Sequence, residues 1–313
     1  MSRPIEGVLP ILHTPFSDDE MIDRDSLARE VDWVFQIGAG GVCTAMVSEL
    51  LRLTAEERVE LTHTMAELAA GRGVVVASIG AESTKQTLAF GAEAVRAGCD
   101  AVMAAPPVAT ALAEDVLLDH FRAIAEAIDL PLIVQDASSY VGQPLSTAFY
   151  ATLLEAYGPE KILFKPEGDP IGPNLSALRD ATGGRARAFD GSGGILLVDA
   201  FRRGIVGTMP GVDLLDGIVA LWRALQAGDE DRAYQLYFPI CAIVALQLQA
   251  GLDGFLAIEK YILVKRGLFT SARRRAPHGW ELDDETRAEV DRLLAHLTAV
   301  IASADSISRP GAP

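Results

Sequence analysis

Cysteine is scarce in this chain of 313 residues, and its three copies lie far apart, at Cys43, Cys99 and Cys241. A disulfide framework or a cysteine-based metal cluster needs more cysteines at closer spacing. The five histidines also lack the spacing of metal ligands. We therefore expect no disulfide framework, no metal and no cofactor, and the three thiols suit the reducing cytoplasm.

Basic residues are outnumbered as well, because 27 lysines and arginines face 43 aspartates and glutamates, for a formal net charge of -16. Such a charge repels the phosphates of nucleic acids and of anionic membrane surfaces, so we expect neither as a partner. The N-terminus has no apolar signal core, and no uninterrupted apolar run is long enough to span a bilayer. These absences predict a soluble, cytoplasmic protein.

What the chain does have is a regular alternation of short apolar runs with longer helical patterns, which is typical of parallel βαβ units. Eight units fill residues 1–228, close to the usual length of a (β/α)8 TIM barrel. The expected strands are 7–12, 41–47, 74–79, 101–105, 130–135, 162–165, 186–189 and 204–209. The expected helices are 24–37, 54–70, 82–97, 114–127, 146–156, 174–182, 193–202 and 214–227.

Strand patterns stop after Gly228, and residues 229–313 contain helical patterns alone. These patterns are 229–250, 254–267 and 283–303. The sequence therefore predicts an α/β fold made of a barrel and a C-terminal α-helical extension, packed on the barrel or on a neighbouring subunit.

Lysine is rare, with five copies in the chain, and one of them ends an apolar strand. Lys165 closes the run 162–165, whose composition indicates a buried strand. A buried ammonium must be paired or held neutral, and a neutral lysine amine is a nucleophile that forms Schiff bases. The plainer alternative is a structural ion pair with Glu167, which lies two residues further on and points to the same face.

The chemistry of a (β/α)8 barrel lies at the carboxyl ends of its strands. This rule places Lys165 on a common rim with the segments that follow the other strands, which favours a functional lysine. The other rim segments are 13–14, 47–49, 105–107, 135–136, 190–192 and 208–211.

Two glycine-rich turns, 190–194 and 207–211, follow the last two expected strands, where many barrels bind phosphate through backbone amides. A phosphorylated ligand is therefore an alternative. No basic residue accompanies either turn before Arg202 and Arg203, which favours an unphosphorylated ligand.

At this point the sequence resembles the dihydrodipicolinate synthase and N-acetylneuraminate lyase family, from about residue 4 to residue 300. The resemblance implies a (β/α)8 barrel with a C-terminal helical domain, usually a homotetramer, in which a sixth-strand lysine forms a Schiff base with pyruvate or another 2-oxo acid. That lysine matches Lys165. The motifs that carry the resemblance are 7–10, Thr14-Pro15-Phe16, the Ser48-Glu49 turn, 53–58, 120–131 and Gly267-Leu268.

The chain departs from the family pattern at the proton relay. The family's Gly-Thr-Thr-Gly-Glu turn reads 45–49 here, so Met46 and Val47 replace two hydroxyls, and Ser48 remains as a substrate-binding candidate. The family's fifth-strand tyrosine is Gln135, which cannot titrate. Tyr140 stands where dihydrodipicolinate synthases place an arginine for the second substrate.

Replacement groups for the relay are expected on the rim. Glu167 is the favoured acid or base because it shares a face with Lys165. The resemblance also implies that Gly191 and Val206, near the seventh and eighth strands, contact the substrate. The other candidates for the relay are Glu49, Asp136, Asp190 and Ser192.

Together these features predict a lyase that acts on pyruvate or another 2-oxo acid through a Schiff base at Lys165, by aldol-type cleavage or condensation. Two alternatives stay open. One is an impaired family member that binds a small carboxylate ligand, and the other is a sugar-acid hydro-lyase on the same scaffold. A homo-oligomer, either a dimer or a tetramer, is expected in each case.

Overall fold

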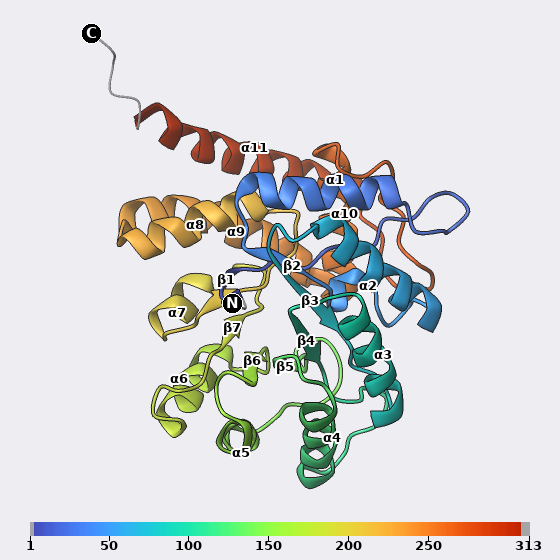
Figure 1. Ribbon diagram of the computed structural model, residues 1–313. Helices are drawn as coiled ribbons and strands as arrows, with labels where there is room; N and C mark the ends of the chain where they lie inside the picture. Colours follow the sequence, from blue (N-terminus) through green and yellow to red (C-terminus); the bar gives the residue numbers. More distant parts are fainter. Residues whose placement is uncertain (1–2, 308–313) are drawn as a thin grey trace.

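The computed structural model describes residues 3–307 and confirms the predicted barrel, with parallel strands inside and helices around them (Figure 1). The strands are β1 Gly7–Val8, β2 Gly41–Cys43, β3 Val74–Ser78, β4 Ala101–Ala104, β5 Leu132–Asp136, β6 Ile162–Pro166, β7 Phe189–Asp190 and β8 Gly207–Thr208. The helices that follow them are α1 Arg24–Ile37, α2 Ala55–Ala69, α3 Thr84–Arg96, α4 Glu114–Ala127, α5 Thr147–Tyr157, α6 Ile171–Ala181, α7 Leu197–Arg202 and α8 Leu215–Ala227.

The strands pair in chain order around the barrel. One ladder runs from β2 to β6, and a second joins β7, β8 and β1. Two parallel bridges connect the ladders, Ile11 with Cys43 and Phe164 with Ala188. The sheet is thereby closed, which leaves the carboxyl ends of all the strands at one rim.

Local sequence signals explain where several barrel elements begin and end. The side chain of Asp23 accepts a hydrogen bond from the Ser26 amide at the start of α1. Thr54 and Glu57 cap α2 reciprocally. Gly38 ends α1 with a φ of 88°, a conformation that glycine adopts without a steric penalty.

Some elements are shorter than the sequence predicts. The first strand is interrupted at Pro10, which has no amide hydrogen to donate. The second ends at Cys43 because the next residues form the 3-10 turn Met46–Ser48. The seventh helix begins only at Leu197, since Gly193 and Gly194 have positive φ angles of 67° and 105° and cannot join a right-handed helix.

Alternate strand residues separate two cores, because successive side chains of a strand point to opposite faces. Ile133 and Leu163 belong to the inner core of the barrel, whereas Val134 and Phe164 pack against the outer helices. The same alternation points Gln135 and Lys165 inward, one residue pair above this apolar plug.

The extension consists of α9 Glu230–Gln247, α10 Gly251–Lys265 and α11 Asp284–Ile307, and residues 308–313 of the expected extension lie outside the described part. Residues 230–265 have the length and composition of a membrane-spanning helix. However, a 3-10 turn divides them, and α9 packs on α8, α10 and α11. This packing is that of the core helices of a globular domain.

Lys260 of α10 fixes the extension to the barrel rim. Its ammonium group is fully buried, pairs with the Glu49 carboxylate, and donates to the backbone oxygens of Thr14 and Arg273, each at 2.8 Å. Burial lowers the pKa of Lys260, against the attraction of Glu49. This buried cation is therefore one of the contacts that hold α10 on the barrel.

We expect Lys260→Met to lower the free energy of unfolding by about 3–5 kcal/mol, because it leaves the Glu49 carboxylate buried without its cation. Urea unfolding measures this. The matched control is Lys265→Met in the same helix, whose half-exposed ammonium pairs with Asp291 and should be worth less than about 1 kcal/mol. Equal losses in the two variants would contradict the assignment.

Candidate active site

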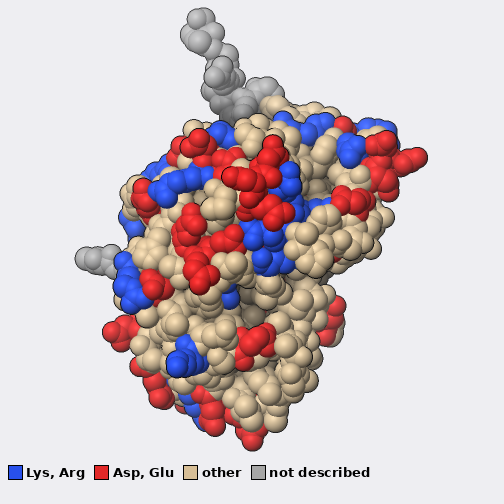
Figure 2. All heavy atoms as spheres, turned by 90° about the vertical axis from the view of Figure 1, so that its right-hand side faces the viewer, with Lys and Arg blue, Asp and Glu red and all other residues tan. Residues whose placement is uncertain are grey.

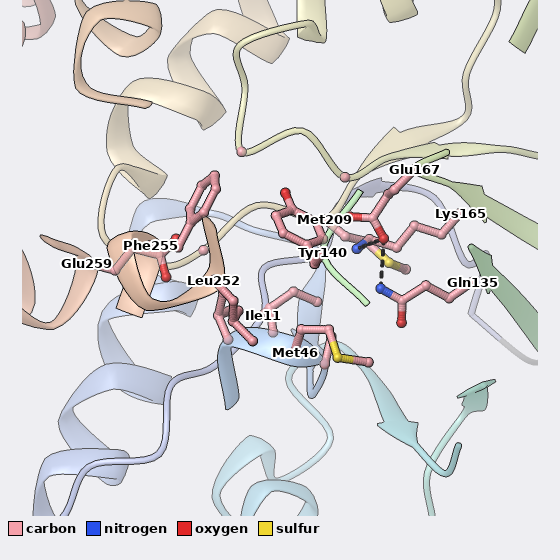
Figure 3. Close-up of a pocket in the computed structure, with 15 residues that line it drawn as sticks. Ile11, Met46, Gln135, Tyr140, Lys165, Glu167, Met209, Leu252, Phe255 and Glu259 are labelled. Carbon is pink, nitrogen blue, oxygen red and sulfur yellow. Dashed lines mark hydrogen bonds and ion pairs between the residues drawn. The ribbon is translucent and has the colours of Figure 1, made fainter. Parts of the chain in front are cut away.

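A cavity lies at the carboxyl ends of the strands, and side chains from both the barrel and α10 line it (Figure 3). Seven of the predicted site residues come together there, and two of these seven, Met46 and Val47, belong to the 3-10 turn. The lining residues are Ile11, Ala45, Met46, Val47, Gln135, Tyr140, Lys165, Glu167, Gly191, Gly193, Met209, Gly211, Leu252, Phe255 and Glu259.

Lys165 and Glu167 form a buried ion pair at the base of the cavity. Their side chains are 4% and 3% exposed, and Lys165 Nζ lies 2.8 Å from Glu167 Oε2. Burial raises the pKa of Glu167, although the charge of Lys165 and a hydrogen bond from Gln135 oppose that shift. A lysine amine and a carboxylate therefore stand side by side in the cavity.

Gly191 gives this pair its room. A Cβ atom at position 191 would overlap the Glu167 carboxylate and would lie 2.7 Å from Lys165 Cε. Any larger residue at position 191 would therefore displace the ion pair. Gly191 lies on the rim, as predicted, and leaves space for the two side chains.

Gln135 binds the same carboxylate from β5. Its Nε2 donates to Glu167 Oε2 at 2.7 Å, while its Oε1 is buried without a hydrogen-bond partner in the part of the chain that the structure describes. A buried acceptor that lacks a donor is unfavourable, so this oxygen is suited to a donor on a bound ligand.

The turn Met46–Ser48 presents backbone and apolar side chains to the cavity, and no hydroxyl. Met46 and Val47 line it, and within residues 3–307 neither of their amides donates a hydrogen bond. Ser48 does not line it, because its Oγ donates to the Leu12 carbonyl and accepts from the Ala45 amide at 3.1 Å. The expectation that Ser48 supplies a hydroxyl therefore does not agree with its position.

Tyr140 covers the cavity from the loop after β5. Its ring packs edge-on against Phe255, with 5.7 Å between ring centroids, and its hydroxyl makes no hydrogen bond to any described residue. Burial, reinforced by the charge of Glu167, raises the pKa of Tyr140 far above its usual value. The side chain is therefore a neutral phenol that can donate one hydrogen bond.

Val206 lies away from the cavity. It precedes β8, its amide donates to the Ala188 carbonyl at 2.9 Å, and its side chain packs on the inner core. The rim is reached only after the strand, where Met209 and Gly211 line the cavity instead. The expectation that Val206 contacts the substrate does not agree with this position.

Helix α10 supplies three lining residues that sequence reasoning missed. Leu252, Phe255 and Glu259 point into the cavity from the side opposite Lys165 (Figure 3). The strand-end rule that located the other residues does not extend to a helix outside the barrel. Their three- and four-residue spacing is the one available signal, and it is shared by any helix face.

The model of the Dihydrodipicolinate synthetase family matches residues 4–297. The chain belongs to that family. A relative named L-2-keto-3-deoxyarabonate dehydratase, from Azospirillum brasilense, is 30% identical over 301 residues, which cover 94% of this chain and 95% of the relative. Members of this family are lyases, and this chain is therefore a lyase of the same family.

Solved structures of the family have the same fold. Dihydrodipicolinate synthase from Rhodopseudomonas palustris superposes with a TM-score of 0.83 at 28% identity, covering 93% of this chain and 97% of that chain. YagE from E. coli K12, described in complex with pyruvate, superposes with a TM-score of 0.87 over 95% of this chain and 99% of its own. Its identity is 22%, so this second likeness concerns the fold alone.

The other residues that the sequence offered as acid or base candidates do not line the cavity. Glu49 is paired with Lys260. Asp136 faces outward, where it accepts hydrogen bonds from the Leu145 amide at 2.9 Å and the Tyr150 hydroxyl at 3.3 Å. Asp190 is buried. Its carboxylate accepts hydrogen bonds from the Thr208 hydroxyl at 3.0 Å and from the Ser192 amide. Glu167 alone among these carboxylates reaches Lys165.

His13 forms a buried bridge behind the cavity. Its Nδ1 lies 3.0 Å from Glu30 Oε1, and its Nε2 lies 2.8 Å from Glu259 Oε2. Burial lowers the pKa of His13, but the two carboxylates outweigh burial and raise it from 6.5 to about 10. His13 is therefore an imidazolium at neutral pH, with both nitrogens donating.

This raised pKa predicts a stability that depends on pH. A group with a folded pKa above its unfolded value stabilises fully below pH 6.5, and the effect is lost as pH rises through about 10. We expect the stability difference between the parent and His13→Gln to shrink steadily from pH 7 to pH 10. Urea midpoints across that range measure it, and a constant difference would show that His13 is neutral in the fold.

Proposed function

We propose that the protein is a Schiff-base lyase that removes water from a hydroxylated 2-oxo acid. The observation that carries the proposal is the buried pair of Lys165 and Glu167, with 2.8 Å between Nζ and Oε2, at the base of the cavity. Lys165 attacks the carbonyl carbon C2, and the carbonyl oxygen leaves as water. The resulting protonated imine is an electron sink for the carbanion that forms at C3.

The substrate carboxylate is held by the turn after β2 in this proposal. Met46 and Val47 line the cavity, and their amides have no acceptor among residues 3–307. Two free backbone amides bind a carboxylate without help from a hydroxyl. This arrangement accounts for a binding turn whose side chains are apolar.

Glu167 acts as the base in the next step. It removes a proton from C3, and the electrons of that bond form an enamine between C2 and C3. The enamine expels the hydroxyl group of C4, which takes the proton that Glu167 now holds and leaves as water, while the neutral Tyr140 phenol can donate a hydrogen bond to that oxygen. Hydrolysis of the conjugated imine frees Lys165 and leaves Glu167 ionised as at the start.

The position of the base favours dehydration over aldol cleavage. Cleavage needs a base at the C4 hydroxyl, whereas dehydration needs one at C3, next to the imine carbon. Glu167 pairs with the lysine nitrogen itself, and in this proposal the imine binds with C3 on the Glu167 side. The likeness to the Azospirillum brasilense dehydratase, at 30% identity over nearly the whole of both chains, supports the same choice.

The test uses a 2-keto-3-deoxypentonate and follows the reaction by NMR, with borohydride trapping and peptide mass spectrometry in parallel. We expect loss of one water from the substrate and a reduced adduct on Lys165. Release of pyruvate and an aldehyde would replace the dehydratase with an aldolase. No turnover and no adduct with any 2-oxo acid would favour a protein that only binds a small carboxylate.

We expect the protein to be a poor dihydrodipicolinate synthase. Gln135 cannot titrate, and Tyr140 offers no positive charge for the carboxylate of aspartate semialdehyde. A coupled assay with pyruvate and aspartate semialdehyde should give turnover about 10²-fold or more below that of a family synthase, since a positioned acid or base contributes at least that factor. Turnover at the synthase level would overturn the substrate assignment.

The proposal includes a cytoplasmic homo-oligomer, either a dimer or a tetramer. Phe238 and Leu248 are 65% and 45% exposed in the single chain, and association of copies would cover such apolar side chains. Acidic and basic side chains are interspersed on the face in Figure 2, which gives nucleic acid no continuous basic surface there.

A further inference from the structure

Glu259 is a buried carboxylate of the cavity that the reaction above does not use. It projects from α10 on the side opposite Lys165, and the residue is 2% exposed (Figure 3). Its Oε2 accepts a hydrogen bond from His13, whereas its Oε1 has no hydrogen-bond partner in the described part of the chain. One oxygen is thus fixed from behind, and the other is free for a ligand.

His13 and Glu30 hold Glu259 in one orientation. The imidazolium of His13 is completely buried between the two carboxylates, and its own backbone amide also donates to Glu30 Oε1 at 3.1 Å. Since both ring nitrogens and the amide are engaged, the ring cannot turn without breaking several charged hydrogen bonds. Glu30 and His13 are therefore positioning residues for Glu259.

Acceptors dominate this end of the cavity. A Cβ atom at Gly211 would lie 2.6 Å from Glu259 Oε1 and 2.9 Å from Asp213 Oδ1, so the glycine keeps the carboxylate accessible. Burial and the charge of Glu259 raise the pKa of Asp213 to about 7. Lys165 is the one cation among the described lining residues, and it stands at the other end. A phosphate or a second carboxylate would meet repulsion here, whereas a hydroxyl would find an acceptor.

We propose that Glu259 binds a hydroxyl group at the end of the substrate remote from its carboxylate, and so selects hydroxylated 2-oxo monocarboxylates. This inference rests on the proposed function, because Lys165 anchors the other end of the same molecule. Glu259 is then a specificity-determining residue. A ligand that lacks this hydroxyl would remove water from the Glu259 carboxylate without replacing the lost hydrogen bond, and it would therefore bind more weakly.

The experiment compares two ligands of equal chain length, a 2-keto-3-deoxypentonate and 2-oxopentanoate, which lacks the hydroxyls. The readout is the ratio of the concentrations that give half-maximal borohydride trapping. We expect the parent protein to favour the hydroxylated acid by about 10- to 100-fold, which is the contribution of one hydrogen bond to a charged group. Glu259→Leu should bring the ratio close to one, and Glu259→Gln should give an intermediate value.

Asp253→Asn is the matched control, because it alters a carboxylate of the same helix that pairs with Arg52 outside the cavity. It should retain the parent ratio. An unchanged ratio in Glu259→Leu and Glu259→Gln, with trapping intact, would overturn the role of Glu259 and leave the Schiff-base lyase standing. An absence of trapping in the parent would overturn both. If Glu259→Leu fails to fold, Glu259→Gln, which preserves the shape of the side chain, decides.

Discussion

Lys165→Ala is expected to abolish the borohydride adduct and to lower kcat by about 10³-fold or more, since a lost covalent route removes at least about 4 kcal/mol of barrier reduction. The physical reason is the position of Lys165, whose amine ends a buried strand inside the cavity. Intact-mass spectrometry after borohydride reduction measures the adduct, and NMR of the substrate measures the rate.

Two further variants separate chemistry from folding. Lys165→Arg keeps a positive charge beside Glu167 but cannot form an imine, so it should also be inactive while remaining folded. Lys161→Ala is the matched control, because Lys161 precedes the same strand and its Nζ donates to the backbone oxygens of Ile128 and Leu130. It should trap as the parent does. An adduct that persists in Lys165→Ala would assign the imine to another lysine.

Glu167→Gln is expected to lower kcat by about 10²- to 10⁴-fold while leaving an imine that borohydride still traps. The amide has the shape of the carboxylate but cannot accept the C3 proton. The sharper measurement is exchange of the C3 protons of pyruvate for deuterium, read by NMR. The parent should exchange them, and the variant should not within the same time.

The neighbouring carboxylate provides the control for Glu167. Asp190 is buried close by but bonds to Thr208 and Ser192 and does not line the cavity. Asp190→Asn should therefore reduce exchange by less than about tenfold, as removal of a group outside the reacting set does. Exchange at the parent rate in Glu167→Gln would show that a different group, with Tyr140 the nearest candidate, takes the proton.

The barrel and its reactive pair were predictable from the sequence because both depend on short-range regularities. The alternation of strand and helix patterns, the length of the repeat and the two-residue period of a strand are all read over a few residues. That period alone places Lys165 and Glu167 on one face, and the structure brings them to 2.8 Å. The pairing of Gln135 with Lys165 across β5 and β6, by contrast, is seen only in the structure.

The errors have the same physical origin as these successes. Ser48 was expected to offer a free hydroxyl, because the sequence shows the residue type but not its hydrogen-bond partner. That partner is the Leu12 carbonyl, which lies 36 residues away in the chain. Val206 was expected to contact the substrate from the family resemblance, but it precedes β8 and packs on the inner core. Strand ends depend on pairing with neighbours, and pairing is not encoded locally.

The sequence by itself determined the eight repeats, the strand-end lysine and the side of the strand on which its carboxylate partner lies, because each follows from residues next to one another in the chain. Only the tertiary structure decided what closes the cavity. Glu259 meets His13 across 246 positions of sequence, and Lys260 meets Thr14 across the same separation. Such contacts follow from the packing of α10 on the barrel rim, where burial turns isolated charges into fixed pairs.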